Sequence, residues 1–504
     1  MRWSITTSRW GWASDVIKQK QQQKQKQCLV STTKENMSLG KVPIELIARG
    51  IESLGPYSAQ SLILNEQHFY KNSILIDWSN KSAHPVTLRH LANFGKKITP
   101  DKLIASANFV RSELPTRLSL KIRELQNLPY QITSNYHINQ VYQSYYHCFN
   151  AFRRVGKIET LEDNENFCEF VTNMLDDHLI VLPHLMMGAL EVSILETMSQ
   201  KDLDEFMSSM LRSRISRRVI MNQHVSMTKA FTTSHSSTDE EHQKPPDYVG
   251  EAFQYCSAHE HLKISYNMTV AFLQSLYPGM KMPELIITGE DFKFQFMTNH
   301  LDYIFTEILR NSLRSTIRKF VEVNNITDFS SMSNLAPPPV FVEVTNTKTE
   351  MTFKFSDQGG GVPLDKIDSI WSFGKNPEMA RKYLDNFYKL PGLDLPERLP
   401  IVEHQYFKKR DEHRKYAPRK IAGVLDNLGK MEVASVEQGK SMLRSLASRP
   451  YAYTLGVSLP MCKVYTDYWN GTLNMCTMEG YGSDVFLKLQ KLGNQEGKLQ
   501  LDKA

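Results

Sequence analysis

The sequence predicts an α + α/β protein in which a helical bundle precedes a domain built on a mixed sheet. Between residues 44 and 231, apolar residues recur every three or four positions and glycines are few, as in long amphipathic helices. From residue 260 onward, helical and alternating patterns are mixed, which indicates helices packed on a sheet. A polar stretch rich in Ser, Thr, His, Glu and Pro separates the two patterns at 237–248. We therefore expect a linker at 237–250.

Length and composition fit two domains, each with its own core. The chain has 504 residues, of which 41% are hydrophobic and 23% charged, and domains usually have ~100–200 residues. No run approaches the ~18–20 uninterrupted apolar residues of a membrane-spanning helix, so we expect no transmembrane segment. The net charge of +6 is small for this length, which argues against a nucleic-acid partner. The six cysteines form no C-x-x-C pair, which argues against a disulfide framework or zinc module.

The first 40 residues have the composition of a targeting segment followed by a linker. Residues 1–20 carry several Arg and Lys residues against a single acid, with Ser, Thr and Trp between them, which is typical of a mitochondrial transit peptide. The polar run at 19–27 is low in complexity and cannot bury a core. A disordered basic tail is the alternative interpretation of this region.

The helical half, which we place at 41–236, predicts an up-and-down bundle. Its clearest amphipathic stretches are 136–155 and 169–195, whose Met and Leu residues we expect in the core. Three or four helices of ~20 residues joined by short loops would form such a bundle. We expect the helices to break near four prolines, namely Pro85, Pro100, Pro115 and Pro129.

A later helix, expected at about 299–320, carries a polar edge. At ~100° per residue, Glu307, Asn311 and Arg314 fall within ~60° of one another. A carboxylate, an amide and a guanidinium therefore line one edge of a helix whose broad arc is apolar. A solvated polar face with one i,i+4 pair is the alternative. The apolar arc consists of Leu301, Phe305, Ile308, Leu309, Leu313 and Ile317.

A glycine-rich loop follows two expected strands. The segments 340–344 and 351–356 alternate between apolar and polar residues, as two paired strands do. The second strand runs into Asp357 and then into three consecutive glycines at 359–361. Such a loop lets main-chain N–H groups approach a ligand, commonly phosphate, while the acid can accept a hydrogen bond. A tight turn alone is the alternative explanation of the glycines.

The C-terminal part predicts a glycine turn, a helix and a second pair of strands. The block 455–469 opens with Gly456 and is otherwise hydrophobic. The segments 473–478 and 483–490 read as strands separated by a turn that contains two glycines. These elements favour a mixed sheet with helices on one face and a nucleotide between the helices and the loops.

Together these blocks resemble the ATP-binding domain that histidine kinases, Hsp90-type chaperones, DNA gyrase and MutL share, the α/β sandwich of the GHKL superfamily. Glu307 and Asn311 match its N box, 357–361 match its first glycine box, and Gly456 with Leu459-Pro460 matches the second. Within this superfamily the chain resembles the mitochondrial kinases of the 2-oxo acid dehydrogenase complexes. The segment SRISRRVIMNQH is similar to the signature helix of pyruvate dehydrogenase kinases, and LDDHLIVLP and MEGYGSDVFLKL also match in order.

The resemblance, which covers roughly 55–495, implies the domain organisation. It implies an N-terminal four-helix bundle followed by a GHKL (Bergerat-type) α/β sandwich at 251–495. A polar insertion at about 376–448 separates the two glycine boxes, and we expect it to loop out of the ATP lid. Residues 496–504 form a tail.

The resemblance assigns roles to residues of the N box and the first glycine box. It implies that Glu307 is the general base that takes the proton from a substrate serine hydroxyl, and that Asn311 binds Mg²⁺. It also implies that Asp357 accepts a hydrogen bond from the adenine amino group and that Gly359 and Gly361 form the hinge of the ATP lid. These roles suit phosphoryl transfer, which needs charge neutralisation and alignment more than covalent chemistry.

The resemblance implies further contacts with ATP and with a regulator. Arg310 stands where the family usually has a lysine, and Thr472 matches a nucleotide-contacting threonine. The other implied ATP contacts are Arg314, Gly456, Val457, Ser458 and Leu459. His178 and Arg217 match positions that line a small-molecule regulatory pocket in pyruvate dehydrogenase kinases, with a surface or cap role as the alternative for His178.

Two features depart from the family pattern. The second glycine box usually reads G-x-G-x-G-L-P, but here it reads T-L-G-V-S-L-P at 454–460 and retains one glycine of three. The altered box motivates an alternative function as a weakly catalytic regulatory subunit. The tail lacks the Asp-Trp pair that braces dimers in pyruvate dehydrogenase kinases, so a homodimer and a heterodimer with a related kinase both stay open.

The function implied by the resemblance is a serine kinase of the mitochondrial matrix that uses ATP and Mg²⁺. Its substrate would be the decarboxylase alpha subunit of the pyruvate dehydrogenase complex, which phosphorylation inactivates. The helical half would dock on the lipoyl domain of the transacylase core. The branched-chain 2-oxo acid dehydrogenase complex is the alternative target. A histidine kinase would instead use His224, which we expect to be a structural histidine of the bundle.

Overall fold

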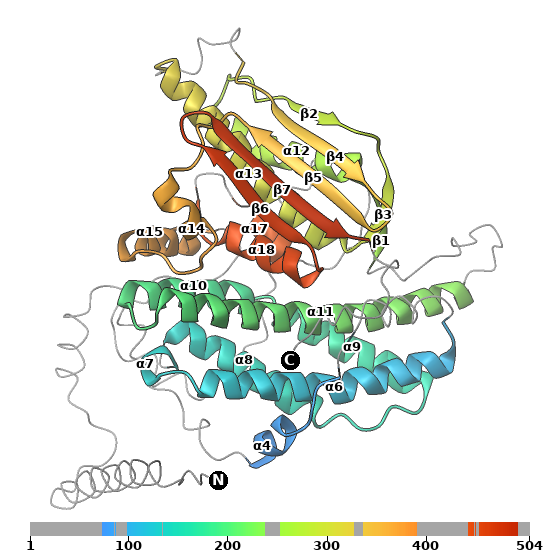
Figure 1. Cartoon of the computed structure of the whole chain (residues 1–504). Coiled ribbons are helices and arrows are strands. Elements are labelled where there is room, and N and C mark those ends of the chain that lie inside the picture. The colour runs from blue at the N-terminus through green and yellow to red at the C-terminus, as the bar shows by residue number, and fades with distance from the viewer. Residues whose placement is uncertain are drawn as a thin grey trace, which may run out of the picture. The chain divides into compact units, whose positions relative to one another are not determined.

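The computed structural model of the chain describes a helical half and a half built on a mixed sheet (Figure 1). The predicted combination of helices with a mixed sheet is therefore confirmed. The expected transit peptide and linker at 1–40, the linker at 237–250 and the tail at 496–504 lie outside the described residues. The structure describes residues 73–84, 86, 98–133, 135–236, 253–326, 336–390, 442–447, 449 and 453–491.

The helical half consists of long helices packed on one another. The helix α6 packs against α8, α9 and α11, while α10 packs against α8 and α9 against α11. The bounds of these helices are α4 Ser73–Ser79, α6 Pro100–Gln126, α7 Tyr130–Thr133, α8 Tyr136–Phe152, α9 Leu161–Asp177, α10 Val181–Leu195 and α11 Gln200–Ser236. The amphipathic stretch at 169–195 is thus divided between two helices, which a short turn connects.

Two helices begin at residues whose side chains cap the helix N-terminus. In contrast, one proline that was expected to break a helix lies inside one. Asn135 begins α8 by accepting a hydrogen bond from the N–H of Ile138 at 3.1 Å, and Thr160 begins α9 in a capping box with Asp163. The prediction that Pro115 marks a helix break is wrong, because Pro115 lies buried inside α6. Packing on both sides of this long helix outweighs the lost main-chain hydrogen bond.

Helices α9 and α10 together form a long apolar stretch. Within the described residues, Leu161–Leu195 is long and apolar enough to cross a membrane, with a mean hydropathy of 1.6 in its best window. However, 89% of that window is buried inside the protein, as in the core helix of a helical domain. The expected lack of a transmembrane segment stays a prediction.

The second half is organised around a five-stranded sheet with strand order β2-β4-β5-β7-β6. The strands β2 and β4 are parallel, and the other neighbours are antiparallel. A separate antiparallel pair is formed by β1 and β3. The strands are β1 Gln254–Ser257, β2 Leu285–Thr288, β3 Lys293–Phe296, β4 Val340–Asn346, β5 Glu350–Asp357, β6 Thr472–Met478 and β7 Gly482–Gln490.

Helices cover one face of this sheet, as predicted. Figure 1 shows α12 (Ala258–Gln274) and α13 (Thr298–Val323) across the same face, and α18 (Ser458–Tyr468) packs on β6 and β7. All six residues of the predicted apolar arc of α13 are buried. The arc faces β5, where Phe353 and Phe355 alternate inward. This packing leaves the polar edge of α13 beside the loop that follows β5.

The expected insertion at 376–448 begins as ordered structure. After the short elements η2 (Leu364–Lys366) and α14 (Ile367–Ile370), helix α15 (Pro377–Tyr388) packs against α10. The Tyr388 hydroxyl lies 3.1 Å from His137 Nε2 in the helical half. The first part of the insertion therefore does not loop out, because contacts with the helical half hold it. Near the end of the insertion, α17 (Met442–Ala447) packs on α13.

Candidate active site

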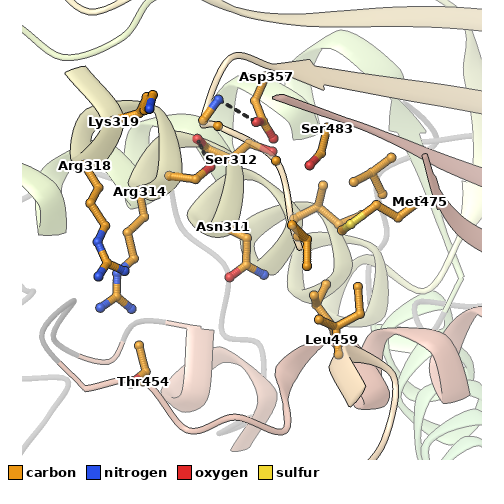
Figure 2. Close-up of a pocket in the computed structure, with 18 of the residues that line it drawn as sticks. Asn311, Ser312, Arg314, Arg318, Lys319, Asp357, Thr454, Leu459, Met475 and Ser483 are labelled. Atoms are coloured by element: carbon orange, nitrogen blue, oxygen red, sulfur yellow. Dashed lines mark hydrogen bonds between the residues drawn. The ribbon is translucent and has the colours of Figure 1, made fainter. Parts of the chain in front are cut away.

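A cavity of ≈ 640 Å³ lies between the polar edge of α13, the loop after β5, and residues of α15 and α18. This volume is within the range of small-molecule sites, ~300–1,000 Å³. Figure 2 shows Asn311 in the middle of the cavity, with Asp357 and Ser483 to one side and Arg314 and Arg318 to the other. The lining includes six of the sequence-predicted ATP contacts, namely Asn311, Arg314, Asp357, Gly359, Gly361 and Leu459.

Asp357 is the last residue of β5, and its carboxylate, which hydrogen bonds fix in place, faces the cavity. Its Oδ1 accepts a hydrogen bond from the N–H of Gly359 at 2.9 Å. Burial raises the pKa of the Asp357 carboxyl, and the hydrogen bonds from Gly359, Ser312 and Ser483 oppose this rise. A fixed, nearly buried carboxylate can accept a hydrogen bond from the exocyclic amino group of a nucleobase. It suits a ligand whose remaining ring surface is planar and apolar.

The glycines after Asp357 meet steric requirements that other residues would not. Gly361 has φ +71°, and a Cβ at this position would overlap the carbonyl of Met478. A Cβ at Gly359 would overlap the side chain of Ser315 on α13. The loop is also tied to the β6–β7 strands, since the N–H of Val362 donates to Thr477 Oγ1 at 2.8 Å. The glycines are thus needed because the main chain of this loop lies very close to α13 and β6. A tight turn alone does not explain them.

The wall of the cavity beyond Asn311 is cationic. Asn311 is exposed, and its Nδ2 donates to the carbonyl of Glu307 at 2.9 Å, so Oδ1 is the atom that can bind a cation. Four cationic side chains share the lining with the acids Asp357 and Glu322, and these four are Arg314, Arg318, Lys319 and Lys382. Cations at one end and a carboxylate at the other match a ligand with a phosphate chain and a neutral base.

Glu307, the expected general base, is not part of the cavity lining. It is 0% exposed, and both of its carboxylate oxygens contact the guanidinium of Arg449. Burial raises the pKa of Glu307, but the charge of Arg449 and its hydrogen bonds outweigh burial and hold this pKa below its usual value. Glu307 is therefore an ionised carboxylate covered by an arginine, one helical turn from Asn311.

Arg310 and the second glycine box also lie outside the lining, apart from Thr454 and Leu459. The Arg310 guanidinium donates to main-chain carbonyls of Ala447 and Arg449, so it holds the chain that precedes this box. Gly456 has φ +71°, and a Cβ there would overlap the ring of Tyr383 on α15. The one retained glycine is therefore required by the contact with α15.

Thr472 lies far from the cavity along the sheet. It is exposed at the start of β6 and pairs with Lys488 on β7, whereas Thr477 pairs with Ser483 at the cavity end of the same two strands. At ~3.3 Å per residue the two ends are well separated. Ser483 lines the cavity, and its hydroxyl lies 3.0 Å from Thr477 Oγ1. At this end of the cavity the lining hydroxyl comes from Ser483, and Thr477 lies beside it.

Several lining residues had no place in the sequence prediction. Arg318 follows Arg314 by four positions, so the helical repeat of α13 could have identified it. Ser483 lies within the block that resembles the family, which is a second available signal. Lys382 and Tyr383 belong to α15 in the insertion, and their place depends on the packing of α15 on α10. No local pattern in the sequence indicates that packing.

The residues predicted for a regulatory pocket meet around one tyrosine of the helical half. The Arg217 guanidinium lies 4.2 Å from the centroid of the Tyr145 ring, and the His178 ring lies 5.9 Å from it. Burial, with the charge of Arg217, lowers the pKa of His178 to about 3. His224 is buried among Ser106 and Cys168, with its Nδ1 3.1 Å from Ser106 Oγ, which favours the structural role.

The chain is similar in sequence to several known proteins. The family model for the mitochondrial branched-chain alpha-ketoacid dehydrogenase kinase matches residues 85–253. The chain is 37% identical to the mitochondrial [pyruvate dehydrogenase (acetyl-transferring)] kinase 2 of Saccharomyces cerevisiae over 92% of its own length and 94% of that protein. It is 24% identical to the Arabidopsis thaliana kinase over 84% and 94% of the two chains. For human isozyme 4 the identity is 22% over 88% of each. The chain belongs to the family of mitochondrial pyruvate dehydrogenase kinases.

Proposed function

We propose that the chain is a protein serine kinase of the mitochondrial matrix that phosphorylates and inactivates the decarboxylase alpha subunit of the pyruvate dehydrogenase complex. Its relatives are named as mitochondrial kinases of pyruvate dehydrogenase, and membership of this family implies use of ATP. The observation that carries the proposal is the cavity itself. It combines a held carboxylate at Asp357, a glycine loop, the exposed amide of Asn311 and a cationic wall.

The order of the helices and strands supports a more specific assignment of the fold. The second half corresponds to the GHKL α/β sandwich. The long helices α6, α8 and α10 supply three helices of the four-helix bundle, and either α9 or α11 supplies the fourth. The order of α13, the β4–β5 pair, the glycine loop, α18 and the β6–β7 pair supports this assignment. Residues 1–40 supply the transit peptide and the linker that follows it.

Different residues of the site have different roles in phosphoryl transfer. Asp357 accepts the hydrogen bond of the adenine amino group, with Ser312 and the loop glycines holding its carboxylate. Arg314, Arg318 and Lys382 neutralise the phosphates, and Asn311 Oδ1 fits a Mg²⁺ ion, which neutralises and aligns the phosphate oxygens when bound. Glu307 accepts the proton of the substrate serine hydroxyl.

The partner surfaces are proposed on the same basis. The helical half docks on the lipoyl domain of the transacylase core, while the decarboxylase alpha subunit presents its serine to the cavity. Homodimers and heterodimers with a related kinase are the possible assemblies. The branched-chain complex is the alternative target, because the matching family model is named for that kinase.

Transfer of labelled phosphate tests the proposed function. The full chain, with ATP labelled at the γ-phosphate and Mg²⁺, is incubated in parallel with purified pyruvate dehydrogenase and purified branched-chain dehydrogenase complexes. We expect label on a serine of the pyruvate dehydrogenase alpha subunit and a matching loss of its activity. Label on the branched-chain complex alone would contradict the choice of substrate, and acid-labile label on His224 would indicate a histidine kinase.

A neighbouring pair of cations on α15 tests the phosphate end of the cavity. Lys382 lines the cavity and Arg381 does not, although both are exposed. We expect Lys382→Gln to weaken binding of Mg-ATP about 3- to 10-fold, within the ~0.5–1.5 kcal/mol of a typical net hydrogen bond, and to leave adenosine binding unchanged. Arg381→Gln is the matched control. Equal effects of both variants on ATP would contradict the assignment.

A weakly catalytic regulatory subunit is the second candidate. The altered second glycine box and the covered carboxylate of Glu307 favour it. Calorimetry distinguishes the two candidates, because a regulatory subunit that has little or no catalytic activity would bind Mg-ATP weakly or not at all whereas the kinase must bind it. We expect the folded chain to bind Mg-ATP more tightly than adenosine or triphosphate alone. Absence of any heat of Mg-ATP binding to the folded chain would favour the regulatory subunit.

A further inference from the structure

A buried ion pair, Glu307–Arg449, lies behind the cavity. Arg449 Nη2 is 2.9 Å from Glu307 Oε2, and Nη1 contacts Oε1. The same Nη2 donates to Ser458 Oγ at 3.1 Å. One guanidinium therefore faces both carboxylate oxygens, which is the strongest arrangement for an arginine and a carboxylate.

Arg449 is itself held in place by main-chain groups. Its Nε donates to the carbonyl of Tyr453 at 3.1 Å, and its Nη1 donates to the carbonyl of Leu446 at 2.7 Å. Arg310 holds the same stretch from α13, since it donates to the carbonyls of Arg449 and Ala447. The ion pair is thus part of a network that connects Glu307 to the residues before the second glycine box.

This arrangement keeps Glu307 from acting as a base. A general base must come within ~2.6–3.2 Å of the hydroxyl it deprotonates, but the Glu307 side chain is fully buried and outside the cavity lining. The positions around its oxygens are taken by Arg449 and by the hydroxyl of Ser458. A carboxylate whose pKa is held low by an adjacent guanidinium is also a weaker base.

We infer, on the basis of the proposed function, that Arg449 masks the catalytic base and that the Arg449–Glu307 pair must separate before a substrate serine is deprotonated. Arg449 acts through Glu307 and is a positioning residue. Its guanidinium and the substrate hydroxyl compete for the same carboxylate oxygens. The strength of this contact therefore sets how often the base is available, and ATP affinity is independent of it.

Replacement of Arg449 tests the inference through kcat. The full chain carrying Arg449→Gln is compared with wild type at saturating Mg-ATP and pyruvate dehydrogenase over a series of alkaline pH values, where a carboxyl group is most completely ionised. We expect kcat to rise severalfold with the ATP dissociation constant unchanged. The gain should vanish in the Glu307→Gln/Arg449→Gln double variant. Arg212→Gln, which removes a half-exposed ion pair with Asp467, is the control and should leave kcat unchanged.

The pH profile gives a second measure that a structural role would not move. The groups that face Glu307 are Arg310 and Tyr303 on α13, Cys462 on α18 and Arg449. Burial raises the pKa of Tyr303 and of Cys462, so both are neutral near pH 7. Without Arg449, burial, which raises the pKa of Glu307, is opposed only by the charge of Arg310 and the hydrogen bond from Ser458, so this pKa is expected to be higher than in wild type. The variant's kcat should then fall as the pH drops through that raised pKa, at a higher pH than in wild type.

Two milder variants keep the inference testable if Arg449→Gln does not fold, which circular dichroism shows. Arg449→Lys keeps a charge without the two-pronged contact, and Ser458→Ala removes one anchor of Arg449 while Glu307 stays paired. We expect each to raise kcat, by less than Arg449→Gln. A kcat equal to or below that of wild type in the folded variants, with unmoved pH profiles, would overturn the inference. If wild-type transfer does not depend on Glu307 at all, the proposed function fails instead.

Discussion

Glu307→Gln is expected to lower phosphoryl transfer to pyruvate dehydrogenase by about 10²–10⁴-fold, the usual contribution of a general base. Glutamine has the shape of glutamate but cannot accept the serine proton at neutral pH. Because Glu307 does not line the cavity, the ATP dissociation constant should stay close to that of wild type. Single-turnover transfer and calorimetry measure the two quantities separately.

The control for this prediction is Glu343→Gln, which removes a carboxylate from the exposed side of β4. Its transfer rate should equal that of wild type. Full transfer activity in Glu307→Gln would refute the assignment of the base. Loss of ATP binding in that variant would mean that Glu307 acts on the nucleotide and not on the serine.

Asp357→Ala is expected to weaken ATP binding by about 10- to 100-fold, because a hydrogen bond to a charged group contributes about 1.5–3 kcal/mol. The carboxylate also accepts the N–H of Gly359, so the variant loses one anchor of the glycine loop. Since the proposed contact is with the adenine amino group, binding of inorganic triphosphate should change little. Calorimetry with ATP and with triphosphate measures the difference.

The matched control is Asp365→Ala, an exposed acid of η2 outside the cavity lining. It should bind ATP as wild type does. ATP affinity that is unaltered in Asp357→Ala would count against the adenine role. An equal loss of affinity for ATP and for triphosphate would mean that Asp357 holds the glycine loop in place and does not contact adenine.

Much of the second half could be predicted from local patterns. The two alternating segments that precede the glycine loop became β4 and β5, and the C-terminal segments became β6 and β7. Their alternation buries one side of each strand, against α13 for β5 and against α18 for β6 and β7, which is why period-two patterns identified them. The short strands β1, β2 and β3 were missed because four residues each carry too little pattern.

The site could be predicted where its residues are close in sequence. Asn311 and Arg314 share one edge of α13, and Asp357, Gly359 and Gly361 share one loop, so spacing alone brings each set together. Thr472 fell on the correct strand pair but at the opposite end from the cavity. The cavity end is set by the register of β6 with β7, which sequence spacing does not give.

The remaining features depend on contacts between segments far apart in the chain. Arg449 reaches Glu307 across 142 positions, and no local pattern distinguishes it from the other basic residues near the insertion. Lys382 reaches the cavity because α15 packs on α10. Long-range packing of this kind selects among many equivalent charged residues, so it becomes visible only in the fold.

The most direct test of the central claim is a crystal structure of the chain with Mg²⁺ and a non-hydrolysable ATP analogue. The account predicts adenine at Asp357, the metal beside Asn311 Oδ1 and the phosphates against Arg314, Arg318 and Lys382. A nucleotide bound in another part of the chain, or bound here with its base toward the cations, would contradict the account.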